Sequence, residues 1–177
     1  MKRKLSIALV LSVALSLVAV APVSAKAPLT GEMDLQFNLG WPGPQDMVPE
    51  WVGTITIDGE EFGMAFFNIG SGKPFDDNPS EVVFFHEIWK IYDMEGFVFD
   101  FGADGALTDF VEGPVVLWGY DTGTVTPANS KYRMNGSVEG AAAPFEEWAG
   151  RHVHMSGIIE WYPFGAPQYA PGTLRIN

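Results

Sequence analysis

The 177-residue sequence contains no cysteine. Disulfide bonds, thiolate catalysis and cysteine-ligated metal sites are therefore excluded, and stability must come from packing. Basic residues are scarce, because 10 Lys and Arg stand against 22 Asp and Glu, for a formal net charge of −12. Such a surface repels phosphate backbones and anionic membranes, so we expect no nucleic-acid partner.

Long hydrophobic runs are confined to the N-terminus. The apolar run at residues 5–21 follows a basic segment and precedes the small residues Val23-Ser24-Ala25. This pattern is typical of a signal peptide cleaved after Ala25, with an uncleaved membrane anchor as the alternative. We expect residues 1–25 to be a helical signal peptide and residues 26–177 to form one secreted domain, free of the membrane. Without the three basic residues of the signal peptide, the domain carries a formal charge of 7 − 22 = −15.

Helical periodicity is almost absent from the domain, whereas apolar and polar residues alternate along most of it. Alternation is typical of β-strands, and Gly, Pro, Asn and Asp separate the segments. Strands are expected at 33–39, 51–58, 61–69, 81–92, 95–101, 115–120, 131–138, 151–162 and 174–177. We predict an all-β domain, a single antiparallel β-barrel of about eight strands, with a β-sandwich as the alternative. One short helical turn is expected within residues 141–150.

Aromatic residues are abundant, with 13 Phe, six Trp and five Tyr. A barrel of this size either fills its interior with large side chains or holds one apolar ligand. We predict that the lumen binds a small apolar or aromatic molecule, and a solidly packed interior is the alternative. The side chains expected to contact the ligand are Phe85, Trp89, Phe97, Phe99, Trp118, Met155 and Trp161. Exposed tryptophans, Trp118 among them, could instead stack on sugar rings.

The three histidines are the candidate metal ligands. His152 and His154 are two residues apart on one expected strand and therefore point to the same side. Two imidazoles at that spacing can bind zinc or copper, with His86 or Glu160 as a third ligand. The same alternation places them opposite Val153, on a face where solvated histidines are the simpler interpretation. We therefore predict no cofactor and keep zinc or copper as the alternative.

Glu87 is the candidate catalytic residue, because it lies between Phe85 and Trp89 on one face of an expected strand. Burial there would raise its pKa and suit it to general acid or base chemistry. An isomerase or cyclase acting on a hydrophobic molecule would need a polar partner such as Tyr92 or Arg133. Asp121 follows an expected strand and is interpreted as a turn residue. The sequence leaves open whether the protein is an enzyme, and a module that binds a protein partner is a further possibility.

A familiar succession of residues lies near the C-terminus. It comprises Asn135-Gly136-Ser137-Val138-Glu139-Gly140-Ala141, then Phe145, Trp148-Ala149-Gly150-Arg151 and Gly157-Ile158-Ile159. This succession resembles the late strand, turn and closing strand of allene oxide cyclase-like and dirigent-like barrels. The resemblance implies an eight-stranded barrel whose apolar lumen holds a hydrophobic small molecule. It implies no catalytic residue, because the cyclases use a lumen cysteine that this chain lacks.

Overall fold

The computed structural model describes residues 26–41, 48–72, 82–160 and 167–177. The expected signal peptide at residues 1–25, its cleavage after Ala25, and Trp161 all lie outside the described residues. Within the described part of the chain, no helix is long and apolar enough to cross a membrane. The strands are β1 (Leu29–Phe37), β2 (Trp51–Ile57), β3 (Glu60–Gly72), β4 (Val83–Tyr92), β5 (Val98–Phe101), β6 (Leu107–Val111), β7 (Val115–Thr126), β8 (Lys131–Ala141), β9 (His152–Ile158) and β10 (Gly172–Ile176).

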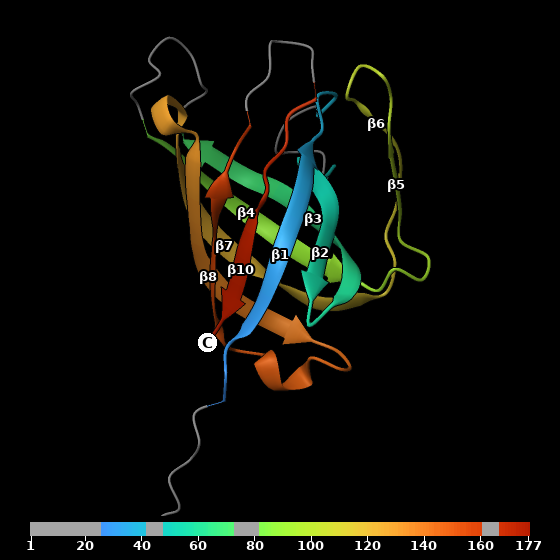
Figure 1. Cartoon of the computed structure of the whole chain (residues 1–177), viewed down its shortest axis with the longest axis vertical. Helices are drawn as coiled ribbons and strands as arrows, with labels where there is room; N and C mark the ends of the chain where they lie inside the picture. The colour runs from blue at the N-terminus through green and yellow to red at the C-terminus, as the bar shows by residue number, and fades with distance from the viewer. Residues whose placement is uncertain (1–25, 42–47, 73–81, 161–166) are drawn as a thin grey trace, which may run out of the picture.

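Eight of these strands close into a barrel in the order β1-β10-β9-β8-β7-β4-β3-β2 (Figure 1). Each neighbouring pair is antiparallel, including β1 with β10, which joins the two ends of the chain. The predicted all-β barrel is therefore confirmed. The expected helical turn within 141–150 is the 3-10 turn η2 (Glu146–Trp148), and a second turn, η1 (Pro127–Asn129), joins β7 to β8.

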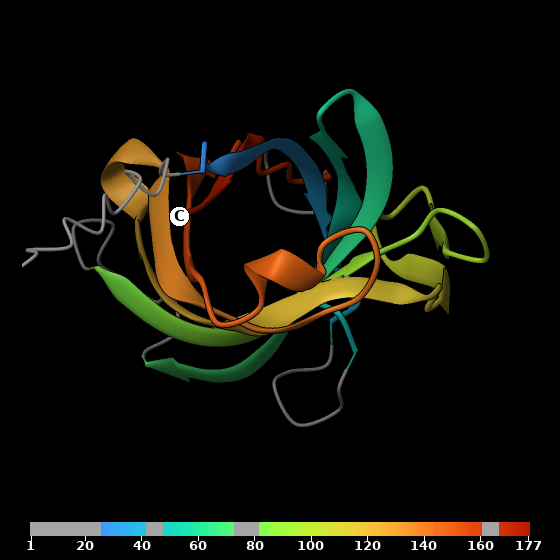
Figure 2. The ribbon, with the colours of Figure 1, turned by 90° about the horizontal axis from the view of Figure 1, so that it is seen from below.

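The lumen is packed with large side chains because alternate residues of each barrel strand face inward. Its largest fully buried members include Met64, Phe66, Trp89, Leu117, Met155 and Leu174. The turn η2 lies across one end of the barrel (Figure 2). There Phe145 packs against Phe62 with ring centroids 5.4 Å apart, and Trp148 is buried in the same cluster. The lumen is closed by side chains at the η2 end.

A second apolar cluster lies outside the barrel, beneath the β5–β6 hairpin. The hairpin covers outward-facing residues of β2, β3 and β4, namely Val52, Ala65, Phe67 and Tyr92. Phe97 stacks on Tyr92 at 4.9 Å and occupies the space above Gly63, where an added Cβ would fall 2.2 Å from the ring. The strand expected at 95–101 therefore belongs to an external hairpin. Both faces of β4 are buried at its C-terminal end.

Candidate functional site

A row of polar side chains crosses the otherwise apolar lumen. Asn68 of β3 is paired in register with Glu87 of β4, and Glu87 is paired with Asp121 of β7. All three face inward and are buried, with 5%, 3% and 3% of their surface exposed. Glu50, which immediately precedes β2, brings a third carboxyl group to this row. We call Glu50, Glu87 and Asp121 the carboxyl cluster.

Hydrogen bonds hold two members of the carboxyl cluster in place. The side-chain amide of Asn68 donates to Glu50 Oε2 at 2.8 Å, and its oxygen accepts from the backbone N–H of Gly70 at 3.0 Å. A β-bulge between Asn68 and Gly70 makes this second bond possible. The carboxyl groups of Glu50 and Glu87 also hydrogen-bond to each other. Two ionised carboxylates cannot hydrogen-bond to each other, so this contact requires a proton on one of the two groups.

The surroundings of the carboxyl cluster favour the protonated, uncharged form of its carboxyl groups. Burial raises the pKa of Glu50 to about 7 and the pKa of Asp121 to about 8. Burial also raises the pKa of Glu87 well above its ordinary value, and the charges of Asp121 and Glu50 raise it further. The cluster can therefore bind and release protons near neutral pH.

Asp121 is the least satisfied member of the carboxyl cluster. Neither of its carboxyl oxygens has a hydrogen-bond partner among the described residues, and the same holds for the indole Nε1 of Trp89. The Trp89 ring lies over Gly119, two residues before Asp121 on the same lumen face of β7. Buried polar groups without partners are rare and cost about 1–3 kcal/mol each. An unmatched acceptor and an unmatched donor in one part of the lumen point to a ligand position.

Apolar side chains surround the carboxyl cluster on both sides. Toward η2, Met64, Ile91 and Leu117 are fully buried and fill the barrel. Toward the opposite end lie Phe85, Met134 and Tyr132. The Tyr132 hydroxyl donates to the backbone oxygen of Ala170 at 3.4 Å, and its pKa is raised by burial and by the charge of Glu87. The polar row is thus an island in an aromatic and aliphatic lumen.

The structure brings three of the predicted ligand contacts into this lumen. Trp89 and Met155 are fully buried there, and Phe85 packs against the same core while remaining partly exposed. Phe85 occupies the space above Gly123, where an added Cβ would fall 2.2 Å from its ring. These three residues and the carboxyl cluster belong to one interior.

The other predicted ligand contacts lie elsewhere. Phe97 and Phe99 are in the cluster beneath the β5–β6 hairpin, outside the barrel. Trp118 is on the outer face of β7, with 38% of its surface exposed. Trp161 lies outside the described residues. Alternation placed the rings on one strand face, but it could not tell an inner face from an outer face covered by a hairpin.

The three histidines are not brought together. His86 and His154 face outward in one row of the sheet, with Thr122 and Asn135 between them, so they are roughly 14 Å apart by the spacing of strands. The ring Nδ1 of His154 lies 3.0 Å from Asn135 Oδ1, and His152 is exposed. Among the described residues, no group of three or more His, Asp or Glu is arranged to hold a metal ion.

The polar partners of Glu87 differ from those that the sequence suggested. Tyr92 faces the hairpin cluster and Arg133 is exposed on the outer face of β8. The interpretation of Asp121 as a turn residue was wrong, because β7 continues to Thr126 and buries this side chain. The alternation of Leu117, Asp121 and Val125 was the available signal. Nothing local in the sequence marked Glu50, since its contacts are with residues of β3 and β4.

The chain matches no family model, no curated protein and no solved structure. The resemblance to allene oxide cyclase-like and dirigent-like barrels therefore stays a prediction.

Proposed function

We propose that the barrel binds a small, largely apolar or aromatic molecule in the half of the lumen away from η2. A hydrogen-bond-donating or cationic group of the ligand faces Asp121. The observation that carries this proposal is the buried carboxyl group of Asp121, neither oxygen of which has a described partner. A ligand that donates to this group would offset the cost of its burial.

The charges around the lumen support a ligand with a basic nitrogen. Three carboxyl groups converge there, whereas every Lys and Arg of the described residues lies on the outer surface. An ammonium group beside the carboxyl cluster would favour its ionised form and supply donors to Asp121. Phe85, Met134 and Tyr132 would contact the apolar part of such a molecule.

The proposal places this binding outside the cytoplasm, as a secreted protein. It is supported by the N-terminal pattern of a basic segment, an apolar run and small residues that ends at Ala25, and by the absence of cysteine from the sequence. N-terminal sequencing of the protein from its own host should find Lys26 as the first residue. Recovery of an intact Met1 would contradict this part of the proposal.

The binding proposal can be tested with three naphthalene probes that differ in one group. Calorimetric titration of residues 26–177 with 2-naphthylmethylamine, 2-naphthalenemethanol and 2-naphthoate should give affinities that decrease in that order. Asp121→Asn should weaken binding of the amine about tenfold, or 1.4 kcal/mol, because a charged hydrogen bond becomes a neutral one. It should change binding of the alcohol much less.

Asp34→Asn is the matched control, since it makes the same substitution at a residue exposed on the outer face of β1. It should leave all three affinities unchanged. Equal affinities for the three probes, or an amine affinity that Asp121→Asn does not alter, would contradict the proposal.

An isomerase or cyclase is the second candidate, and the proton shared by Glu50 and Glu87 favours it. A pair with one group near pKa 7 offers an acid and a base side by side in an apolar lumen.

Incubation of a hydrophobic extract of the host in D₂O should then yield a deuterated product with wild-type protein. Glu50→Gln and Glu87→Gln should each abolish the label, and the same product pattern with all three proteins would rule out this chemistry.

A further inference from the structure

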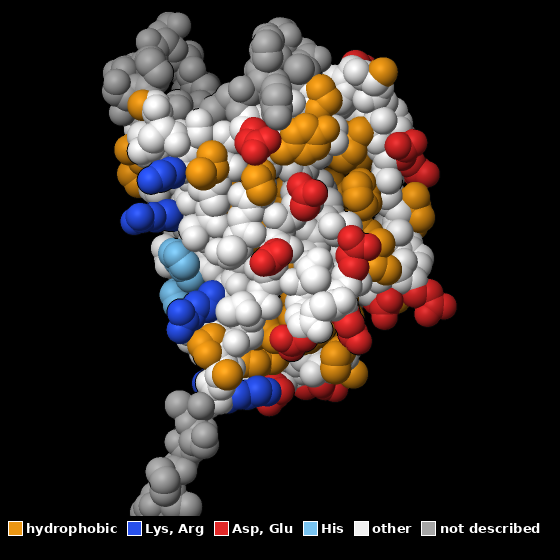
Figure 3. Space-filling model, viewed as in Figure 1, with side chains coloured by type: hydrophobic (Ala, Val, Ile, Leu, Met, Phe, Trp, Pro, Cys, Tyr) orange, Lys and Arg blue, Asp and Glu red, His pale blue; other side chains and the backbone are white. Residues whose placement is uncertain are grey.

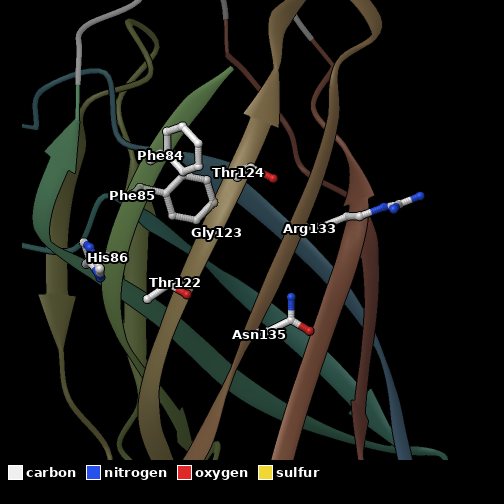
Figure 4. A pocket seen from close by; sticks show the side chains of 8 residues that line it. All are labelled: Phe84, Phe85, His86, Thr122, Gly123, Thr124, Arg133 and Asn135. Carbon is white, nitrogen blue, oxygen red and sulfur yellow. The ribbon is translucent and has the colours of Figure 1, made fainter. Parts of the chain in front are cut away.

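The outer face of β4, β7 and β8 carries a groove that the proposed lumen function does not use. The groove has a volume of about 470 Å³ and opens to solvent beside the three strands (Figure 4). Its outward-facing lining is Phe84 and His86 of β4, Thr122 and Thr124 of β7, and Arg133 and Asn135 of β8. The lining thus combines one aromatic ring, hydroxyls, an amide, an imidazole and a guanidinium group.

Exposed aromatic residues continue the groove along β7. Phe84 at its edge is 60% exposed, and Tyr120 and Trp118 are 49% and 38% exposed. Trp118, Tyr120, Thr122 and Thr124 alternate on one face of β7, a line of about 20 Å at the rise of a β-strand. The groove is therefore one end of a longer strip, which we call the outer strip.

Trp118 has the geometry of a stacking platform. Its indole lies against the backbone at Gly140 of β8, where an added Cβ would fall 1.9 Å from Cζ2. Because glycine allows this close approach, one broad face of the ring rests on the sheet while part of the residue remains exposed. The apolar C–H face of a sugar ring packs well on such a surface, since the aromatic face is electron-rich.

Positive charge gathers beside the outer strip, although the domain as a whole is strongly acidic. Lys131, Arg133 and Arg175 lie on the outer faces of β8 and β10, with His154 between them on β9. Figure 3 shows basic and histidine side chains along one edge of the molecule and acidic side chains over the rest of the visible face. Lys90 is paired with Glu112, but Arg133 has no ion pair with any described residue. An anionic partner fits this edge.

We propose that the outer strip binds a glycan that carries sparse carboxylate groups. Trp118, Tyr120 and Phe84 contact sugar rings, Thr122, Thr124 and Asn135 hydrogen-bond to hydroxyls, and Arg133 forms a bidentate pair with a uronate. A second copy of the chain fits poorly, because two domains of charge −15 repel each other. Screening within about 8 Å at physiological ionic strength lets the local basic edge act on a sparsely charged chain.

The test compares two forms of a methyl-esterified oligogalacturonate: one in which a few rings keep a free carboxylate, called the acid form, and one fully esterified, which keeps the sugar rings and removes the charge. Calorimetry should show that residues 26–177 bind the acid form at least tenfold more tightly than the ester. Arg133→Ala should abolish this preference, whereas Trp118→Ala should weaken both forms. Lys26→Met, which removes an exposed cation paired with Glu147 beside η2, and Asp121→Asn in the lumen should leave both affinities unchanged. Urea unfolding should confirm that each variant is folded.

Failure to bind either form would overturn the proposal. Equal binding of acid and ester would also overturn it, because Arg133 would then have no anionic partner. An acidic peptide that binds as tightly as oligogalacturonate, with no loss in Trp118→Ala, would assign the strip to a protein partner instead. Since Asp121→Asn does not touch the strip, these outcomes are independent of the lumen proposal.

Discussion

The two apolar clusters of this molecule differ in one respect. Beneath the β5–β6 hairpin, the buried side chains are apolar or aromatic, and the carboxyl group beside them, that of Glu112, is exposed and paired with Lys90. The lumen has a similar aliphatic and aromatic lining but also holds Glu50, Glu87 and Asp121. The hairpin cluster is what packing for stability produces. Carboxyl groups in the lumen lower stability, which is the expected signature of a site kept for function.

Removal of a ring from the hairpin cluster should have the largest effect. Phe97 is 6% exposed and contacts the rings of Tyr92, Phe99 and Phe110. Phe97→Ala should lower the free energy of unfolding by about 3–5 kcal/mol, as expected for loss of a buried ring. Urea denaturation followed by tryptophan fluorescence would measure this change.

Phe84→Ala is the control for that substitution, because it removes the same ring from an exposed position. Its effect should be within about 0.5 kcal/mol. A loss in Phe97→Ala as small as the one expected for Phe84→Ala would mean that the hairpin contributes little to stability, and the contrast between the clusters would then fail.

Replacement of a lumen carboxyl group should increase stability at high pH, whereas removal of a hairpin ring decreases it. The pKa of Asp121 is about 8 in the folded protein against an ordinary 3.8, so the folded state holds a proton that the unfolded state has lost. Stability is therefore full below about pH 4 and decreases as the pH rises toward 8. Asp121→Asn should make the stability depend less on pH. At pH 8 its free energy of unfolding should exceed that of wild type by about 1–3 kcal/mol, and it should therefore unfold at a higher temperature.

Thermal unfolding at pH 5 and pH 8 would compare wild type, Asp121→Asn and the exposed variant Asp34→Asn. The last variant makes the same substitution outside the lumen and should keep the wild-type difference in stability between the two pH values. Identical pH dependence in all three proteins would show that the lumen carboxyl group does not differ from a surface one.

The smallest effect should come from the edge between the hairpin and the barrel. Lys90 Nζ lies 2.9 Å from both carboxylate oxygens of Glu112 and 4.9 Å from the centre of the Phe67 ring. Lys90→Met keeps the aliphatic stem and removes the charge, and it should cost less than about 1 kcal/mol because the pair is partly exposed. Raising the salt concentration should reduce the difference in free energy of unfolding between Lys90→Met and wild type. A loss above about 1 kcal/mol that does not depend on salt would contradict the interpretation of Lys90 and Glu112 as a partly exposed ion pair.

Alternation was sufficient to predict the all-β class, because a strand with one buried face must alternate, although the strands of a β-sandwich alternate in the same way. It was not sufficient for residues 97–101, since rings beneath an external hairpin repeat at the same period as rings in a lumen. Asp121 was missed because Thr122, Gly123 and Thr124 resemble a connection, although they continue β7. The contact of Glu50 with Glu87 joins residues far apart in the chain, and no local pattern encodes it.

The pairing of β1 with β10 also constrains how the chain can fold. Leu29 lies opposite Ile176, so the first barrel strand finds its second neighbour only after nearly the whole sequence is available. Until then, β1 and β9 each present an unpaired edge, which is a template for association with other chains. Closure depends on the most distant contacts in the sequence, which slows folding. A truncation before Gly172 should therefore leave an open, aggregation-prone sheet, even though residues of the carboxyl cluster would all be present.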